Sequence, residues 1–229
     1  MPEELERKVI AFYRQLSRET GNRFVSVRSS ASAEDLKAAS FAGQYDTYLY
    51  VQSEETLLAR IVDCWNSLFS ERATAYRERM KIPGTNLQMA VVVQTMIDPG
   101  AAGILFTSYP YGGGKRVMVV ESSWGCGDTV VSGKVTPDHF VVSRDEFHTL
   151  LETLPGNKDI QLRGGDSGPV EESVPADRKK NNSLSSDELT RLCTIGKKIE
   201  NHFNQPQDIE WALDNNGKIV ILQSRPITR

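Results

Sequence analysis

The residues best suited to chemistry lie near the end of the chain, in two alternating segments, DIEWAL (208–213) and KIVILQSR (218–225). Side chains of a strand point alternately to its two faces. If the Asn-Gly between the segments forms a two-residue hairpin turn, Glu210 lies directly opposite Gln223. Opposed side chains have Cβ atoms about 4.5–5.5 Å apart. The oxygens of this carboxylate and this amide could then bind one hard cation such as Mg²⁺.

The same register places Asp208 opposite Arg225 on the same face of the hairpin. A guanidinium at this position could bind a phosphate that the cation also contacts. A four-residue loop preserves these faces, whereas a three-residue loop reverses them. A solvated polar face with a surface Asp208–Arg225 ion pair is the alternative interpretation, and the hairpin alone leaves both open.

A second candidate is the stretch VRSSASAEDLKAASFAGQ (27–44), which separates two short strands. Arg28 stands at the end of the first strand, where a rigid backbone aims a guanidinium well suited to phosphate oxygens. Gly43 allows a ligand to approach the backbone closely. A long loop in a compact domain is more often functional than idle. The alternative is a hydroxyl-rich loop that caps a helix near residues 33–38.

Other motifs carry little signal. The GGGK stretch (112–115) does not match a phosphate loop of the Walker type. The three histidines lack an acid or nucleophile at motif spacing, and each is interpreted as a structural or surface residue. The three cysteines are widely spaced, which supports neither a disulfide framework nor a metal site and indicates a reducing compartment.

The elements that must position these candidates form an α+β pattern. The sequence predicts helices over residues 3–18, 54–80 and 185–204, strands over 24–27, 46–51, 89–95, 103–107 and 117–122, and a closing hairpin. Gly21 and Asn22 end the first helix, and a capping box of Ser185 and Glu188 opens the last one. Residues 155–183 show little periodicity and are predicted to be a mobile surface excursion.

Composition narrows the class of protein. The 229 residues are 39% hydrophobic and 25% charged, enough for one large domain or two small ones. A net charge of −3 argues against nonspecific nucleic-acid or membrane-surface binding. The charged amphipathic N-terminus has no apolar signal core, so we expect a cytoplasmic protein.

Five segments in order resemble one enzyme family. VRSSASAEDLKAASFAGQYDTYL is similar to the signature of the nucleotide-binding domain shared by phosphoenolpyruvate synthase (pyruvate, water dikinase), pyruvate phosphate dikinase and rifampicin phosphotransferase. CWNSLFSERATAYRERMKIP, MAVVVQTMIDPGAAGILFTSYP, ESSWGCGDTVVSGKVTPDHFVV and DIEWALDNNGKIVILQSRPIT continue the match. The sequences AEDL and SFAGQ are more similar to the synthase and rifampicin branches than to the phosphate dikinase. The resemblance implies an ATP-grasp-like fold with mixed and antiparallel sheets and flanking helices, with ATP lying between two α+β lobes.

The resemblance also implies roles for particular residues. Arg28 and Arg225 match residues that contact ATP phosphates and would stabilise charge during transfer, while Glu210 and Gln223 match Mg²⁺ and phosphate ligands. The resemblance implies four further nucleotide-site residues, Gln44, Thr47, Gln94 and Met96. Of these, Gln94 and Met96 would form the hinge that receives adenine.

The chain also departs from the family pattern. It shows neither the glycine-rich segment with an ATP-binding lysine nor the Thr-Ser-His or Thr-Cys-His motif of the phosphohistidine domain. We therefore expect residues 1–229 to be an incomplete ATP-binding domain without full dikinase turnover, its phosphohistidine and substrate domains acting in cis or in trans. An exposed apolar face would favour a homo-oligomer. A nucleotide-sensing module and the ATP domain of a rifampicin phosphotransferase-like enzyme remain alternatives, and the phosphate acceptor stays open.

Overall fold

The computed structural model describes residues 1–32, 35–36, 39–40, 43–82, 87–109, 116–166 and 168–227. The chain divides into two compact units. The first comprises Met1–Met96 and Gly164–Pro169, and the second Ile97–Arg163 and Val170–Ile227. The chain thus first leaves the first unit directly after Met96, at the end of the strand in which the sequence predicts an adenine-binding hinge.

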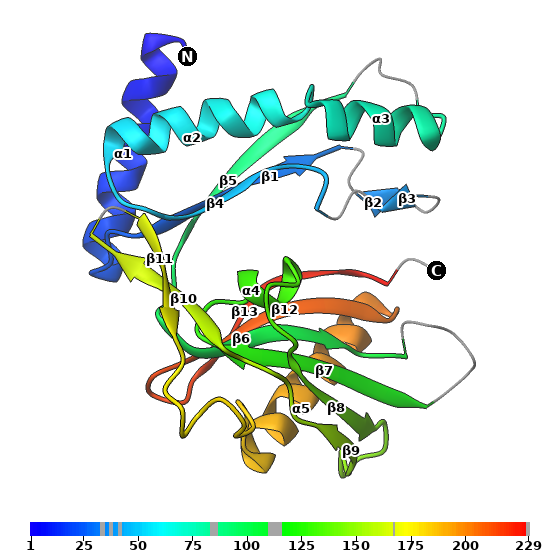
Figure 1. Cartoon of the computed structure of the whole chain (residues 1–229). Coiled ribbons are helices and arrows are strands. Elements are labelled where there is room, and N and C mark those ends of the chain that lie inside the picture. The colour runs from blue at the N-terminus through cyan, green and yellow to red at the C-terminus, as the bar shows by residue number, and fades with distance from the viewer. Residues whose placement is uncertain are drawn as a thin grey trace. The chain divides into compact units, whose positions relative to one another are not determined.

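The first unit is a three-stranded antiparallel sheet covered by helices (Figure 1). Its strands, in the order β4-β1-β5, are Thr47–Val51, Val25–Ala31 and Met89–Thr95. Helix α2 (Glu54–Ser67) packs on β1 and β5, and α1 (Glu3–Thr20) packs against α2 and β5. Helix α1 ends at Thr20, and the following Gly21, which the sequence predicts as a helix stop, adopts the left-handed conformation. The core between these layers contains Tyr13, Val25, Val27, Val51, Leu57, Ile61 and Cys64.

The predicted helix over 54–80 is wrong at its centre, because the structure has two helices there. Helix α2 ends at Ser67, and α3 (Glu71–Arg79) begins after Ser70, whose hydroxyl accepts a hydrogen bond from the Ala73 amide at 3.2 Å. Serine is favoured as an N-cap over a helix interior, so it offers the chain a new start. The break buries Leu68 and leaves Phe69 76% exposed.

The second unit is a six-stranded antiparallel sheet in the order β13-β12-β6-β7-β8-β9 (Figure 1). In that order the strands are Ile219–Pro226, Gln207–Asp214, Pro99–Phe106, Val117–Trp124, Asp138–Ser143 and Leu150–Leu154. A one-turn helix, α4 (Asp128–Val131), follows β7.

One face of this sheet is covered by helix α5 (Ser186–Phe203), which begins with the predicted Ser185–Glu188 capping box. The apolar side chains of α5 and of four strands form a single core that includes Leu105, Phe140, Leu192 and Trp211. Gly196 permits the close approach, since a Cβ there would overlap the side chain of Leu105. The opposite face carries Asp208 and Glu210, because their neighbours Ile209 and Trp211 point into the core.

The segment 155–183 contains regular structure that the sequence does not predict. Strands β10 (Ile160–Gly165) and β11 (Gly168–Ser173) pair as a two-stranded sheet. Its start is anchored by the fully buried Lys158, which forms an ion pair with the fully buried Asp138. Buried charges need such pairing, and a strand with mixed polarity leaves no periodic signal. The predicted mobility of this segment remains a prediction.

The predicted α+β class with antiparallel sheets and flanking helices is confirmed. Two very short strands, β2 (Asp35–Leu36) and β3 (Ala39–Ser40), form a further two-stranded sheet. Across the described part of the chain, no helix combines the length and apolar character needed to cross a membrane.

Candidate functional site

The closing hairpin has the predicted pairs but not the predicted turn. Glu210 lies opposite Gln223, and Asp208 lies opposite Arg225. However, the Asp214 amide donates to the Lys218 carbonyl at 3.0 Å, which encloses a three-residue loop instead of a two-residue turn. The last loop residue is a glycine with φ of 75°, as expected for a three-residue loop. The two-residue turn is therefore wrong.

A bulge in β13 explains why the pairs survive this error. Glu210 pairs with Gln223, but the next residue, Trp211, pairs with Ile221, so that Leu222 is an extra residue. A three-residue loop alone would reverse the faces, and the bulge reverses them again. Glu210 and Gln223 consequently lie side by side on the face opposite α5.

Arg225 is held in place by Asp208. Its Nε and Nη2 atoms lie 2.9 and 2.8 Å from the same carboxylate oxygen, Oδ2. The side chains are only 19% and 13% exposed, so this is not the solvated surface pair of the alternative interpretation. The other oxygen, Asp208 Oδ1, is buried and accepts no hydrogen bond within the described residues. A carboxylate oxygen without a donor is a suitable ligand for a cation or a bound hydroxyl.

The loop after β7 adds negative character near Glu210. Burial raises the pKa of the Cys126 thiol, and the charges of Asp128 and Glu210 add to this rise, whereas hydrogen bonds from the backbone of Asp128 and Gly127 oppose it. Gly127 lies against β6, where an added Cβ would be 3.6 Å from the Cβ of Ala102. The carboxylates of Asp128 and Glu210 therefore both act on the Cys126 thiol and disfavour its anion.

The acidic groups alone do not complete a metal site. Among the described residues, no three His, Cys, Asp or Glu side chains are arranged to hold a metal ion. A divalent cation here would therefore need the Gln223 amide oxygen and further oxygens from a ligand such as a polyphosphate. The donor set fits Mg²⁺, which usually retains waters and phosphate oxygens in its coordination shell.

In the first unit, three predicted residues lie close together. Arg28 on β1 is paired with Thr47 on β4. Gln44 lies in the turn just before β4, after Gly43 with φ of 70°. The Ser29 amide donates to the Asp46 carbonyl at 3.3 Å, which extends the β1–β4 pairing into this turn.

Much of the loop between these residues is outside the described part of the chain. Residues 33–34, 37–38 and 41–42 are not described, including two of the five residues of the SFAGQ segment (40–44). The alternative of a helix near 33–38 is contradicted where the chain is described, because Asp35–Leu36 pairs with Ala39–Ser40 as strands.

The predicted hinge residues lie at the end of β5. Gln94 pairs with Ser26, and the Met96 amide donates to the Phe24 carbonyl at 2.9 Å. The Met96 carbonyl accepts from the side chain of Asn22 at 2.7 Å. The Met96 amide is thus already hydrogen-bonded within the fold, so among its backbone groups an adenine could use only the remaining lone pair of the carbonyl.

Sequence reasoning missed two residues that support the candidates. Asp208, which holds Arg225, was expected opposite that arginine, whereas Arg72 and Asp46, which hold the turn that contains Gln44, were given no role. The signal for Arg72 is a cation in the first turn of a helix, where the helix dipole disfavours positive charge.

Known proteins resemble this chain over its whole length. The family model described as "Pyruvate phosphate dikinase, AMP/ATP-binding domain" matches residues 1–229. A probable phosphoenolpyruvate synthase from Methanothermobacter thermautotrophicus is 41% identical over all of this chain and 33% of its own length. A rifampicin phosphotransferase from a Streptomyces species is 42% identical over all of this chain and 26% of its own length. The chain thus spans about a third or less of these curated relatives.

A solved structure, D-alanyl-alanine synthetase A from Vibrio cholerae, matches 96% of this chain and 46% of that one, with 13% identity and a TM-score of 0.38. This similarity is too distant to carry a functional argument. The match of the family model over the whole chain is decisive, and the chain belongs to the pyruvate phosphate dikinase AMP/ATP-binding domain family.

Proposed function

We propose that the chain binds ATP together with Mg²⁺, as the nucleotide-binding portion of a phosphotransferase of the phosphoenolpyruvate synthase type. The observation that carries the proposal is the pairing of Glu210 with Gln223, beside an Arg225 that Asp208 orients. This arrangement offers a cation two kinds of oxygen and offers a phosphate one guanidinium.

Each residue has a defined part in this proposal. Glu210 and Gln223 hold Mg²⁺, which would neutralise phosphate charge when bound. Arg225 binds a phosphate oxygen, and its ion pair with Asp208 fixes the orientation of its guanidinium.

The first unit supplies a second set of contacts. Arg28 binds phosphate from the end of its strand, and Gln44 and Thr47 bind nearby polar groups of the nucleotide. Gln94 and Met96 contact adenine, with Met96 offering its side chain and a carbonyl lone pair.

Phosphoryl transfer depends mainly on positioning and on charge neutralisation, which these residues supply. In the whole protein, the phosphate would pass from ATP to a histidine of another domain and then to an acceptor. A synthase-like acceptor and a rifampicin-like acceptor both fit the relatives, whose names cover both activities. A cytoplasmic location fits the spacing and odd number of cysteines.

Calorimetric titration of the chain with MgATP tests the proposal. We expect binding by the parent chain and at least a tenfold weaker affinity for Glu210→Ala, since even the loss of a residue that only supports a metal ligand typically costs about 10–100-fold. Removal of Mg²⁺ with a chelator should weaken the parent by a similar factor.

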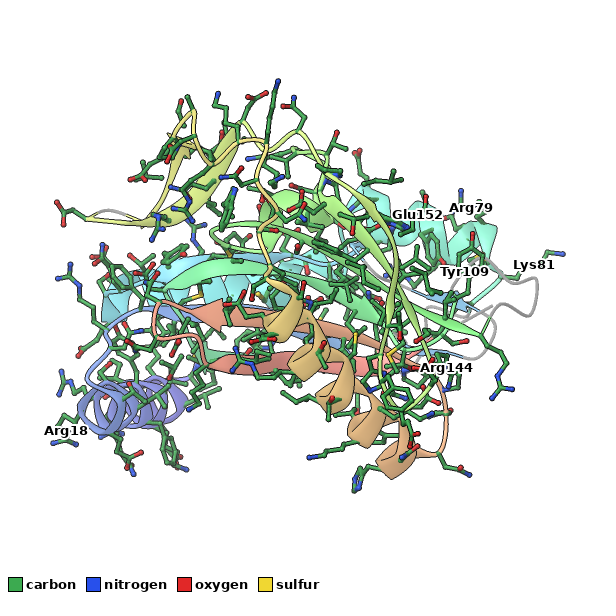
Figure 2. All side chains as sticks on the ribbon, turned by 90° about the horizontal axis from the view of Figure 1, so that it is seen from below. Arg18, Arg79, Lys81, Tyr109, Arg144 and Glu152 are labelled. Carbon is green, nitrogen blue, oxygen red and sulfur yellow. The ribbon has the colours of Figure 1, made fainter. Side chains whose placement is uncertain are left out.

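Glu152→Ala is the matched control. This glutamate is an exposed residue on β9, the outer strand at the opposite edge of the same sheet (Figure 2). Its removal should leave affinity unchanged. Equal affinities of Glu210→Ala and the parent would refute the assignment of the hairpin, and no binding by the parent would refute the proposed function.

A further inference from the structure

Arg72 occupies an unfavourable place on its helix. It is the second residue of α3, and the N-terminal turn of a helix carries partial positive charge. A cation there is disfavoured unless something else holds it. The partner in the structure is not on α3 but in the turn before β4.

The contacts of Arg72 converge on that turn. Its Nε donates to the Gln44 carbonyl at 3.2 Å, and its Nη2 lies 3.1 Å from Asp46 Oδ1. The planar guanidinium thus bridges a backbone oxygen and a carboxylate two residues apart, a geometry that a lysine cannot reproduce. We call Arg72, Asp46 and the Gln44 carbonyl the Arg72 clamp.

Asp46 links the Arg72 clamp to the surrounding elements. Its amide donates to Ser67 Oγ at 3.3 Å, and its second carboxylate oxygen accepts from the Tyr48 hydroxyl at 3.2 Å. Its carbonyl accepts from the Ser29 amide, next to Arg28. The turn is therefore tied to the end of α2, to the start of α3 and to β1.

The ion pair in the Arg72 clamp is poorly suited to a purely stabilising role. The two side chains are 55% and 41% exposed. Pairs with this exposure contribute little to the stability of a fold. This contact joins two groups in a defined orientation but adds little stability. It is better explained as a contact that fixes the position of the residues it holds.

We infer that Arg72 and Asp46 position Gln44 and Thr47 for nucleotide binding, as supporting residues that do not themselves contact the ligand. This inference rests on the proposed function. Thr47 follows Asp46 directly and lies opposite Arg28, so a shift of the turn would displace both polar side chains relative to that guanidinium. Small displacements of positioning groups cost affinity without breaking the fold.

The test is titration of the full chain with MgATP, using Arg72→Ala, Arg72→Lys and Asp46→Asn. We expect roughly tenfold weaker affinity for Arg72→Ala, the low end for loss of a supporting residue. Arg72→Lys should bind almost as weakly, because it keeps the charge but not the two-point contact. The affinity of Asp46→Asn should lie between those of the parent and Arg72→Ala. The melting temperatures of all three variants should stay close to that of the parent.

Arg14→Ala is the matched control, since Arg14 also forms an exposed two-point ion pair in the first unit, with Glu54. Its affinity should equal that of the parent. A double-mutant cycle with Gln44→Ala measures the coupling between Arg72 and Gln44 in MgATP affinity, which a purely structural role of Arg72 would not produce. The loss caused by Arg72→Ala should shrink when Gln44 is already absent.

The outcomes separate the inference from the proposed function. Parent-like affinity of Arg72→Ala, in a chain that loses binding on Glu210→Ala, overturns the inference and leaves the proposed function intact. Parent-like affinity of Arg72→Lys would show that Arg72 acts as a charge on the ligand, and this overturns the inference. The inference is also overturned if Arg72→Ala weakens affinity as much in the Gln44→Ala background as in the parent. A parent chain that does not bind MgATP overturns both.

Discussion

The two units hold their candidate residues by different means. In the second unit, Glu210 and Gln223 stand on neighbouring strands of a six-stranded sheet, and the arginine beside them is fixed by a largely buried carboxylate. In the first unit, Gln44 stands in a turn that an exposed arginine holds from a separate helix. The hairpin is rigid through its sheet, whereas the turn depends on a few polar contacts. Changes behind the hairpin should therefore affect stability, and changes at the Arg72 clamp should affect ligand affinity.

The largest contrast should come from one tryptophan in each unit. Trp211, whose side chain points from β12 into the core, is 1% exposed, whereas Trp65 on α2 is only partly buried. Trp211→Ala should lower the free energy of unfolding by about 3–5 kcal/mol, the usual cost of truncating a buried aromatic residue. Urea denaturation should show a clearly smaller loss for Trp65→Ala. Equal losses would contradict the greater rigidity assigned to the hairpin.

A smaller contrast is expected for the two aspartates that hold arginines. Asp208→Ala leaves the mostly buried Arg225 without its partner and should cost about 2 kcal/mol, less than for a fully buried pair. Asp46→Ala removes an exposed ion pair and should cost less than about 1 kcal/mol through that pair. The same urea titrations measure both variants, and a reversed order would remove the basis for the comparison.

The smallest effect concerns one buried thiol in each unit. Burial raises the pKa of Cys64 in the first unit and of Cys193 in the second from 9.0 to about 12, with Asp46 and Asp63 contributing at Cys64. In the unfolded chain the thiols ionise near the ordinary value. The folded state is thus fully favoured below pH 9, and this stability is lost as pH rises from about 9 towards 12.

Thermal melts at pH 8 and pH 10 test this sign. Cys64→Ser and Cys193→Ser remove the titrating groups, so each variant should lose less of its melting temperature between these pH values than the parent does. A parent chain and variants with identical pH dependence would mean that the buried thiols do not contribute.

Local patterns predicted the parts of the fold that depend on local chemistry. The capping box before α5, the glycine that ends α1 and the alternation of the closing hairpin all rest on residues within a few positions of one another. The β10–β11 pair was missed because its anchor is the Lys158–Asp138 contact, which spans 20 residues. The break between α2 and α3 was missed because apolar spacing was weighed above the capping tendency of Ser70.

The residues of the candidate site likewise differ in whether local patterns predict them. Alternation placed Asp208, Glu210, Gln223 and Arg225 on one face from the sequence alone. The roles of Gln44, Thr47, Gln94 and Met96 came only from the resemblance to a family and remain predictions. Arg72 stood in a quoted motif without a role, because its contact with Asp46 joins residues 26 positions apart and no local pattern encodes it.

The bulge at Leu222 also bears on how this hairpin tolerates insertions and deletions. The loop of odd length and the bulge together keep Gln223 and Arg225 on the face opposite the core. If either one changed by a single residue alone, these two side chains would turn towards the core. Relatives that shorten the turn by one residue should therefore also lose the extra residue in the strand. Segments of even length, in contrast, can be inserted at the loop without disturbing the residues below it, which makes this turn a suitable site for a peptide label.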